Sequence, residues 1–250
     1  MVYFIGAGPG DPDLLTIKGK KIIDRADVII YAGSLVNKEI LKDAKADAAI
    51  YNSAAMTLEE VLAVMQKAEA DGLVTARVHT GDPSVFGAHR EQMDALKQLG
   101  IPYEVIPGVS SFVAAAAALK KEYTLPGVSQ TVILTRMEGR TAMPPKESIR
   151  DLARHNATMV IFLSVGMIDR LAAELMQEYR PDTLAAVVYK VSWENQKIVQ
   201  GTLSDIARKV TDAGIKKTAL IVVGDFLGEE YELSRLYDKT FSHEYRRAEH

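Results

Sequence analysis

The sequence contains no cysteine, which excludes disulfide bonds, thiolate metal sites and cysteine nucleophiles. It also lacks an excess of positive charge, because 30 basic residues stand against 33 acidic ones and the formal net charge is -3. No global basic field is therefore present to attract nucleic acid. We expect a protein without a nucleic-acid partner.

Long hydrophobic runs are missing as well. The longest apolar stretches, such as Met159 to Ile168, are too short to span a bilayer and are typical of a buried strand with the turn that follows it. Met1 leads directly into an apparent strand, without the basic region of a signal peptide. We therefore expect a cytoplasmic protein with no membrane partner.

What the sequence does contain is an alternation of short β-rich runs with longer helical patterns, which is typical of α/β folds with parallel strands and helical crossovers. The first series of predicted strands covers Val2–Gly6, Asp27–Ala32, Ala48–Asn52, Val74–Thr80 and Tyr103–Pro107. The second series covers Gln130–Thr135, Thr158–Ser164, Leu184–Val191 and Thr218–Gly224. We expect two α/β domains, with residues 1–120 in the first, 121–228 in the second and 229–250 in a polar, aromatic C-terminal tail.

Two of the predicted helices have clear local signals. Thr57 and Glu60 form a capping-box pattern at the start of one helix, and Gly72 marks its end. The run of alanines from Ala114 to Ala118 is typical of a helix packed closely against a sheet.

The first strand runs into a glycine loop that resembles a dinucleotide fingerprint without completing it. Gly6 and Gly8 fit the G-x-G-x-x-G pattern, but Asp11 occupies the third glycine position. The second strand ends in the stretch Ile29–Asn37, which offers no acidic residue for a ribose. These two departures disfavour a nucleotide-binding oxidoreductase.

Three loops after predicted strands contain the most unusual residues, and ligands of open parallel sheets bind beyond the carboxyl ends of the strands. The loops are GAGPGDPDLLT (6–16), TGDPSVFG (80–87) and IPGVSS (106–111). Gly81 allows a ligand to approach the backbone closely. Ser110 or Ser111 can cap the helix that follows, with its backbone N–H groups facing the ligand.

Together, in this order and spacing, the three loops resemble those of the tetrapyrrole (precorrin) methylase family. The stretches QKIVQGTLSDIA (196–207) and TALIVVGD (218–225) extend the resemblance over essentially the whole chain. The resemblance implies an S-adenosylmethionine-dependent methyltransferase that releases S-adenosylhomocysteine. It also implies two α/β domains with mainly parallel sheets, an active-site cleft between the domains and a homodimer.

The resemblance further implies a set of methyl-donor contacts, most of them through the backbone. By motif these are Pro9, Thr80, Gly81, Asp82, Val85, Ser110, Ser111, Leu163, Val191 and Ala219. Taken without the resemblance, Leu163 and Val191 would be interpreted as core residues.

The resemblance also points to a subgroup. Members that methylate uroporphyrinogen usually carry an Asp after the tyrosine of the second strand and a Lys after the third strand, and both are missing here. The stretches YAGSLVN, FGAHREQM, TRMEGRT and LYDKTFSHEYR instead resemble the precorrin-4 C11-methyltransferases of cobalamin synthesis, including those that act on the cobalt-containing substrate.

The expected substrate is a flexible macrocycle that carries many carboxylates. Arg136 and Arg140 are candidates to bind them, since guanidinium groups pair bidentately with carboxylates. Glu91 and Ser34 are further candidates for the substrate site by resemblance. We assign no catalytic acid or base, because the sulfonium donor is already activated and positioning can supply much of the rate. No His/Asp/Glu cluster has metal-ligand spacing, so any cobalt should belong to the substrate.

Several alternatives stay open within the same fold. They are a uroporphyrinogen-III or other precorrin C-methyltransferase, a diphthine synthase and a methylase of ribosomal RNA ribose. A non-catalytic binding module is disfavoured, because all three donor loops are retained.

Overall fold

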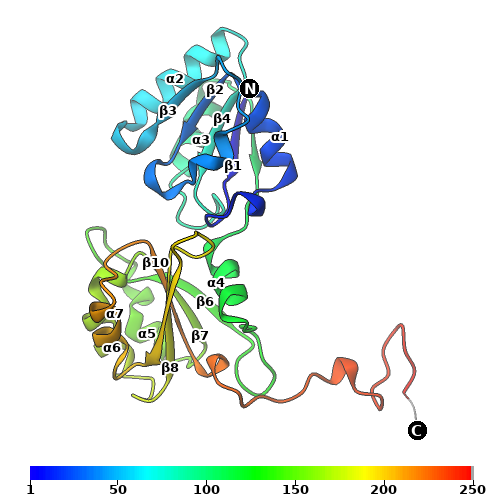
Figure 1. Ribbon diagram of the computed structural model, residues 1–250, viewed down its shortest axis with the longest axis vertical. Coiled ribbons are helices and arrows are strands. Elements are labelled where there is room, and N and C mark those ends of the chain that lie inside the picture. The colour runs from blue at the N-terminus through cyan, green and yellow to red at the C-terminus, as the bar shows by residue number, and fades with distance from the viewer. Residues whose placement is uncertain (249–250) are drawn as a thin grey trace. The chain divides into compact units, whose positions relative to one another are not determined.

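The computed structural model describes residues 1–248, without the side chain of Ser34 (Figure 1). The chain forms two compact units. The first consists of Met1–Ala118 together with Lys190–Lys197, and the second of Leu119–Tyr189 together with the chain from Ile198 onward. The segment 190–197 belongs with the N-terminal unit, although it lies within the predicted second domain in the sequence.

The first unit is built on a five-stranded sheet in the order β3-β2-β4-β1-β5. All four pairs of neighbouring strands are parallel, as the alternating pattern predicts. Parallel strands are covered on both faces and therefore consist of nearly continuous apolar runs. The strands are β1 (Val2–Gly6), β2 (Val28–Tyr31), β3 (Ala49–Asn52), β4 (Thr75–His79) and β5 (Tyr103–Ile106).

Helices cover both faces of this sheet (Figure 1). The helix α1 (Ile17–Arg25) buries Ile22 and Ile23 against one face. The helices α2 (Leu58–Ala70) and α3 (Arg90–Gln98) bury Met65 and Leu96 against the other. The capping box predicted at the start of α2 is present.

The second unit contains a mixed sheet in the order β6-β7-β10-β8-β9. Its strands are β6 (Val132–Arg136), β7 (Thr158–Phe162), β8 (Leu184–Tyr189), β9 (Lys197–Thr202) and β10 (Ala219–Val223). The strands β6 and β7 are parallel, but β10 runs antiparallel to both β7 and β8. The prediction of parallel strands is therefore wrong for these two pairs, because a strand buried on both faces has the same apolar pattern in either direction.

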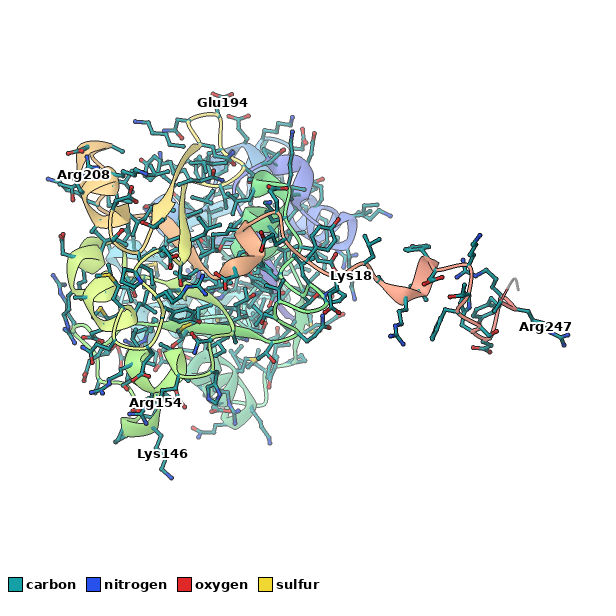
Figure 2. All side chains as sticks on the ribbon, turned by 90° about the horizontal axis from the view of Figure 1, so that it is seen from below. Lys18, Lys146, Arg154, Glu194, Arg208 and Arg247 are labelled. Atoms are coloured by element: carbon teal, nitrogen blue, oxygen red, sulfur yellow. The ribbon has the colours of Figure 1, made fainter. Side chains whose placement is uncertain are left out.

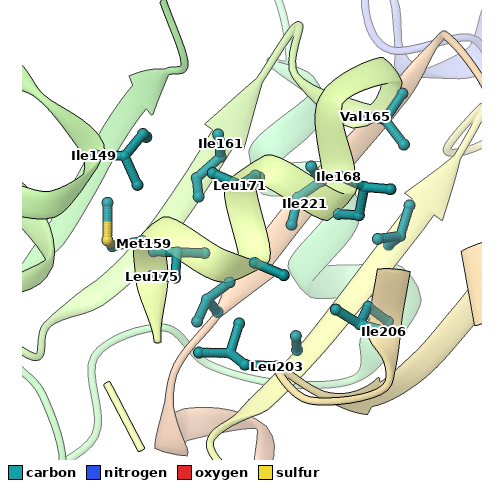
Figure 3. Packing of buried hydrophobic residues seen from close by; sticks show 14 of the residues in the cluster. Ile149, Met159, Ile161, Val165, Ile168, Leu171, Leu175, Leu203, Ile206 and Ile221 are labelled. Atoms are coloured by element: carbon teal, nitrogen blue, oxygen red, sulfur yellow. The ribbon is translucent and has the colours of Figure 1, made fainter. Parts of the chain in front are cut away.

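The core of the second unit lies between this sheet and three helices (Figure 3). These are α5 (Ile149–Ala153), α6 (Ile168–Leu175) and α7 (Ile206–Asp212). Leu171 and Ile161 are fully buried where α6 packs on β7. The alanine-rich stretch forms the predicted helix, α4 (Ser111–Leu119), with Ala115 fully buried.

Short 3-10 helices complete the described secondary structure. They are Pro12–Leu14, Gly33–Leu35, Lys38–Leu41, Ser53–Ala55, Pro145–Glu147, Val165–Met167, Asp225–Leu227 and Arg235–Tyr237. Across residues 1–248, none of the helices combines the length and the apolar character needed to cross a membrane.

Candidate functional site

In the first unit, the three glycine-containing loops pack directly against one another. The N–H of Gly8 donates to the carbonyl of Gly81 (3.2 Å), and the N–H of Gly81 donates to the carbonyl of Gly8 (2.8 Å). A Cβ on Gly6 would lie 2.6 Å from Gly108, and a Cβ on Gly108 would lie 2.3 Å from the carbonyl oxygen of Gly81. Real Cβ atoms do not approach backbone this closely, so the glycines allow the loops to meet.

Asp82 links two of these loops through its carboxylate. One oxygen accepts from the N–H of Gly108 (2.8 Å), and the other accepts from the N–H of Ser84 (2.8 Å) and from the Ser84 hydroxyl. Burial opposes ionisation of this carboxyl, but the hydrogen bonds from Ser84 and Gly108 prevail and lower its pKa. Asp82 is therefore ionised at neutral pH and braces the loops.

We expect Asp82→Asn to destabilise this arrangement, because the amide has one acceptor oxygen and would present its NH2 group either to the N–H of Gly108 or to the N–H of Ser84. Leaving a partly buried donor unsatisfied costs about 1–3 kcal/mol. The wild-type contribution is present above the unfolded-state pKa of the carboxyl and is lost as pH falls through the lowered folded-state pKa. Urea unfolding of both proteins at pH 7 measures the difference, and equal midpoints with equal slopes would show that the brace contributes nothing.

Two buried polar atoms lie beside Asp82 without a partner. Within residues 1–248, the Thr80 hydroxyl and Nε2 of His79 have no hydrogen-bond partner, although both are buried. His79 is only 3% exposed and packs among aromatic rings, with centroids 6.0 Å from Phe4 and 5.7 Å from His89. Burial, followed by the charges of Arg77 and His89, lowers the pKa of His79 to about 3. This imidazole is therefore neutral at physiological pH.

The neutral state of His79 predicts a pH-dependent stability. Because its folded-state pKa lies below the ordinary value of about 6.5, its contribution is complete above that pH and is lost as pH falls toward 3. The slope from one such group approaches about 1.4 kcal/mol per pH unit. We expect His79→Phe to flatten the fall in unfolding free energy between pH 7 and 5. An unchanged slope would show that other groups cause the acid sensitivity.

The turn after Asp82 is held in an uncommon backbone conformation. Phe86 and Ala88 have φ of 54° and 47°, a region that costs free energy for residues other than glycine. A Cβ on Gly87 would lie 2.1 Å from the carbonyl oxygen of Pro83. The N–H of Val85, a predicted donor contact, donates to the carbonyl of Asp82 (3.3 Å). Backbone outliers of this kind cluster at functional sites.

The other predicted donor contacts of the first unit lie next to these loops. Ser110 is buried, and its Cα lies 3.6 Å from the position of a Cβ on Gly81. Ser111 is the first residue of α4. Pro9 is buried, and its carbonyl accepts a hydrogen bond from Nε1 of Trp193. Val191 is also buried, as the interpretation without the resemblance expected.

Leu163 and Ala219, the predicted contacts from the second unit, lie at the same edge of its sheet. Leu163 follows β7 and Ala219 begins β10, and the β7–β10 register places them opposite each other. Leu163 is 70% exposed and has φ of 54°, so the interpretation as a core residue is wrong. An apolar side chain held exposed in a left-handed conformation favours a role in ligand contact.

The next residue, Ser164, is one that sequence analysis missed. It is fully buried, and its hydroxyl donates to the carbonyl of Phe162 (2.6 Å) and accepts from the N–H of Met137 (2.8 Å). Ser164 thus joins the end of β7 to the TRMEGRT loop (135–141). A serine after an apolar strand gave no sequence signal that distinguished it from an ordinary turn residue.

The two arginines of the TRMEGRT loop differ in their hydrogen bonding. The Arg136 guanidinium donates to the carbonyls of Met137 (3.3 Å), Thr141 (3.2 Å) and Ala142 (2.9 Å), so it organises its own loop. Arg140 is exposed, and within residues 1–248 its guanidinium makes neither a hydrogen bond nor an ion pair. Of the two predicted carboxylate-binding groups, Arg140 is therefore the one with a free guanidinium.

The remaining substrate candidates lie in the first unit. Glu91 is an exposed residue in the first turn of α3. Ser34 lies in the 3-10 helix Gly33–Leu35, and its side chain is outside the described part of the structure.

Known proteins with similar sequences show the family of this chain. The family model of the tetrapyrrole (corrin/porphyrin) methylases matches residues 1–207. A cobalt-precorrin-4 C(11)-methyltransferase of Methanocaldococcus jannaschii is 60% identical, over 99% of this chain and 96% of that protein. A precorrin-4 C(11)-methyltransferase of Pseudomonas aeruginosa is 48% identical, over 99% of each chain.

Solved structures agree with this assignment. The X-ray structure of a cobalt precorrin-4 methyltransferase matches with a TM-score of 0.89 at 44% identity, covering 91% of this chain and 96% of that one. A uroporphyrin-III C-methyltransferase from Thermus thermophilus, solved with S-adenosylhomocysteine, matches with a TM-score of 0.76 at 28% identity, covering 90% and 98% of the two chains. The resemblance seen in the three loops is thus confirmed, and the chain belongs to the tetrapyrrole (corrin/porphyrin) methylases.

Proposed function

We propose that the protein transfers a methyl group from S-adenosylmethionine to C11 of precorrin-4, with the cobalt-containing form as its substrate. The observation that carries the methyl-donor part of the proposal is the unpaired Thr80 hydroxyl, which lies in one of three loops that pack closely together at Gly6, Gly81 and Gly108. The identities to precorrin-4 C11-methyltransferases support the substrate, and the cobalt form is favoured by the 60% identical relative. Uroporphyrinogen methylation is disfavoured because its two ionisable residues are missing.

The residues present fit a methyl donor. The Thr80 hydroxyl offers a buried polar group without a protein partner, and Gly81 adds backbone with no side chain to obstruct a ligand. Exposed Leu163 supplies apolar surface. We propose that Thr80 and Gly81, with the other predicted contacts of the first unit, hold the donor; Leu163 and Ala219 remain predicted donor contacts of the second unit.

The bound donor would supply a methyl group already activated on a sulfonium. The chain's own residues then have to orient it and exclude water, which can account for much of a rate enhancement. Since His79 is neutral and buried, it adds no charge that would repel a cationic donor. The ionised carboxylate of Asp82 braces the loops and carries a charge of the favourable sign.

For the substrate, we propose that Arg140 binds a carboxylate of the macrocycle directly. Arg136 contributes through the shape of the loop, because its guanidinium already donates to three carbonyls. Glu91 and Ser34 remain proposed substrate contacts. We further propose that the protein is cytoplasmic and forms a homodimer. The exposed aromatic side chains of the C-terminal tail, such as Tyr237 at 83% and Tyr245 at 88%, support the homodimer alone.

Mass spectrometry tests the proposed function. The protein is incubated with S-adenosylmethionine and, separately, with cobalt-precorrin-4, metal-free precorrin-4 or uroporphyrinogen III. We expect the mass of one added methyl group with cobalt-precorrin-4 and slower reaction with the metal-free form. Methylation of uroporphyrinogen III alone would replace the proposal with the alternative subgroup.

A further inference from the structure

The segment Lys190–Lys197, which joins β8 to β9, holds the first glycine loop from one side. Nε1 of Trp193 donates to the carbonyl of Pro9 (3.0 Å). The indole covers Gly10, where a Cβ would lie 2.1 Å from Cδ1 and 2.2 Å from Nε1. The Ser192 hydroxyl accepts from the N–H of Asp11 (2.9 Å). Three consecutive loop residues are therefore contacted by two consecutive residues of this segment.

The segment has an internal structure that fixes these two side chains. Lys190 and Ser192 have φ of 46° and 65°, backbone angles that residues other than glycine rarely adopt. The N–H of Ser192 donates to Oε1 of Gln196 (2.7 Å), and the N–H of Gln196 donates to the carbonyl of Trp193 (3.0 Å). The Lys190 ammonium lies 5.3 Å from the indole centroid. This bonding keeps the indole in place before any ligand arrives.

The opposite side of the loop is held as well. The Asn37 side chain donates to the carbonyl of Gly10 (2.9 Å), and Gly8 is paired with Gly81. The Pro9–Asp11 loop thus lies between two fixed neighbours. Its conformation has little freedom while Trp193 is present, because a mobile indole would release both the Pro9 carbonyl and the cover over Gly10.

We propose that Trp193 is a positioning residue for the methyl donor. It fixes Pro9 through the loop and Val191 through its own segment, and so sets the distance between two proposed donor contacts. The inference rests on the proposed function, since Pro9 and Val191 matter only where the donor binds. Trp193 needs no contact with the donor to act in this way.

A double-mutant cycle between Gly10 and Trp193 tests the proposal. No left-handed φ is required of Gly10, so alanine fits its backbone, and the three atoms nearest to the added Cβ all belong to the indole. We expect Gly10→Ala to weaken S-adenosylhomocysteine binding at least tenfold, measured by calorimetry. In a Trp193→Ala background, the same substitution should cost less than threefold, because the obstacle is gone. Trp193→Phe keeps a ring over Gly10 but loses the indole N–H that donates to Pro9. Its affinity for S-adenosylhomocysteine should lie between those of the wild type and Trp193→Ala.

Glu194→Ala is the matched control, since Glu194 lies on the same segment and is exposed (Figure 2). It should bind S-adenosylhomocysteine as wild type does. Melting temperatures establish that each variant is folded. Folded Gly10→Ala and Trp193→Ala variants with wild-type affinity, or costs that simply add, would overturn the proposal.

The wild-type protein offers a second measurement that needs no variant. Trp193 is the only tryptophan, so the intrinsic fluorescence excited at the indole reports on it alone. We expect its emission to stay nearly unchanged at S-adenosylhomocysteine concentrations that saturate the calorimetric binding, because the indole is fixed beforehand and need not contact the ligand. A shift in emission that saturates at the calorimetric Kd would show that the indole moves or contacts the ligand on binding, and would contradict the positioning role. Absence of binding to the wild-type protein would instead contradict the proposed function.

Discussion

Replacing Gly81 by valine is expected to lower the affinity for S-adenosylhomocysteine more than about tenfold, a loss of roughly 1.4 kcal/mol or more. Gly81 has φ of +62°, where a β-branched residue is strained by about 1–3 kcal/mol. A Cβ at this position would already be in van der Waals contact with Cα of Ser110 and N of Ser111, both at 3.6 Å, so the two further methyl groups of valine have little room beside the start of α4. The valine would therefore disturb both the donor loops and the backbone next to Thr80.

A matched control separates strain from the site. Gly72 has φ of +70°, and a Cβ there would have no atom within 4 Å. Gly72→Val should thus lose a similar amount of stability, measured by thermal unfolding, and keep its affinity for S-adenosylhomocysteine. If a folded Gly81→Val variant binds as tightly as Gly72→Val, the loop around Gly81 is not part of the donor site.

Replacing Arg140 by alanine is expected to raise the Kd for precorrin-4 roughly tenfold to a hundredfold while donor affinity stays near wild type. A hydrogen bond to a charged group contributes about 1.5–3 kcal/mol, which converts to this range. The Arg140 guanidinium is exposed, so it is available to a carboxylate. High salt should weaken wild-type substrate binding in the same direction, since exposed ion pairs are screened.

Arg208→Ala provides the control for a general loss of charge. Arg208 lies on the surface helix α7, paired with Asp212 at 3.5 Å (Figure 2). Its removal should leave substrate binding unchanged. Equal Kd values for the Arg140→Ala and wild-type proteins would show that the substrate's carboxylates are bound elsewhere.

The first unit could be predicted well from sequence because its signals are local. Each strand is a short apolar run, and the capping box at Thr57 and Glu60 defines a helix start within four residues. The glycine loops could also be recognised from the sequence, because glycine is the residue that allows two backbones to approach closely, as at Gly81 and Gly108.

The features that sequence reasoning missed depend on contacts distant along the chain. The antiparallel direction of β10 depends on which strands it joins, and its apolar pattern does not encode that choice. Trp193 and Pro9 are 184 residues apart in the sequence, so no local pattern indicated the hydrogen bond between them. The Arg136 guanidinium donates to backbone carbonyls. Because every residue has a backbone carbonyl, these hydrogen bonds leave no pattern in the sequence.

The position of the transferred methyl group tests the central claim most directly. Cobalt-precorrin-4 is incubated with the protein and S-adenosylmethionine labelled with ¹³C in the methyl group, and the product is examined by NMR. The account predicts one new labelled methyl signal, correlated with C11 of the macrocycle. A labelled methyl on any other ring carbon, or an unlabelled substrate recovered in the presence of bound donor, would contradict it.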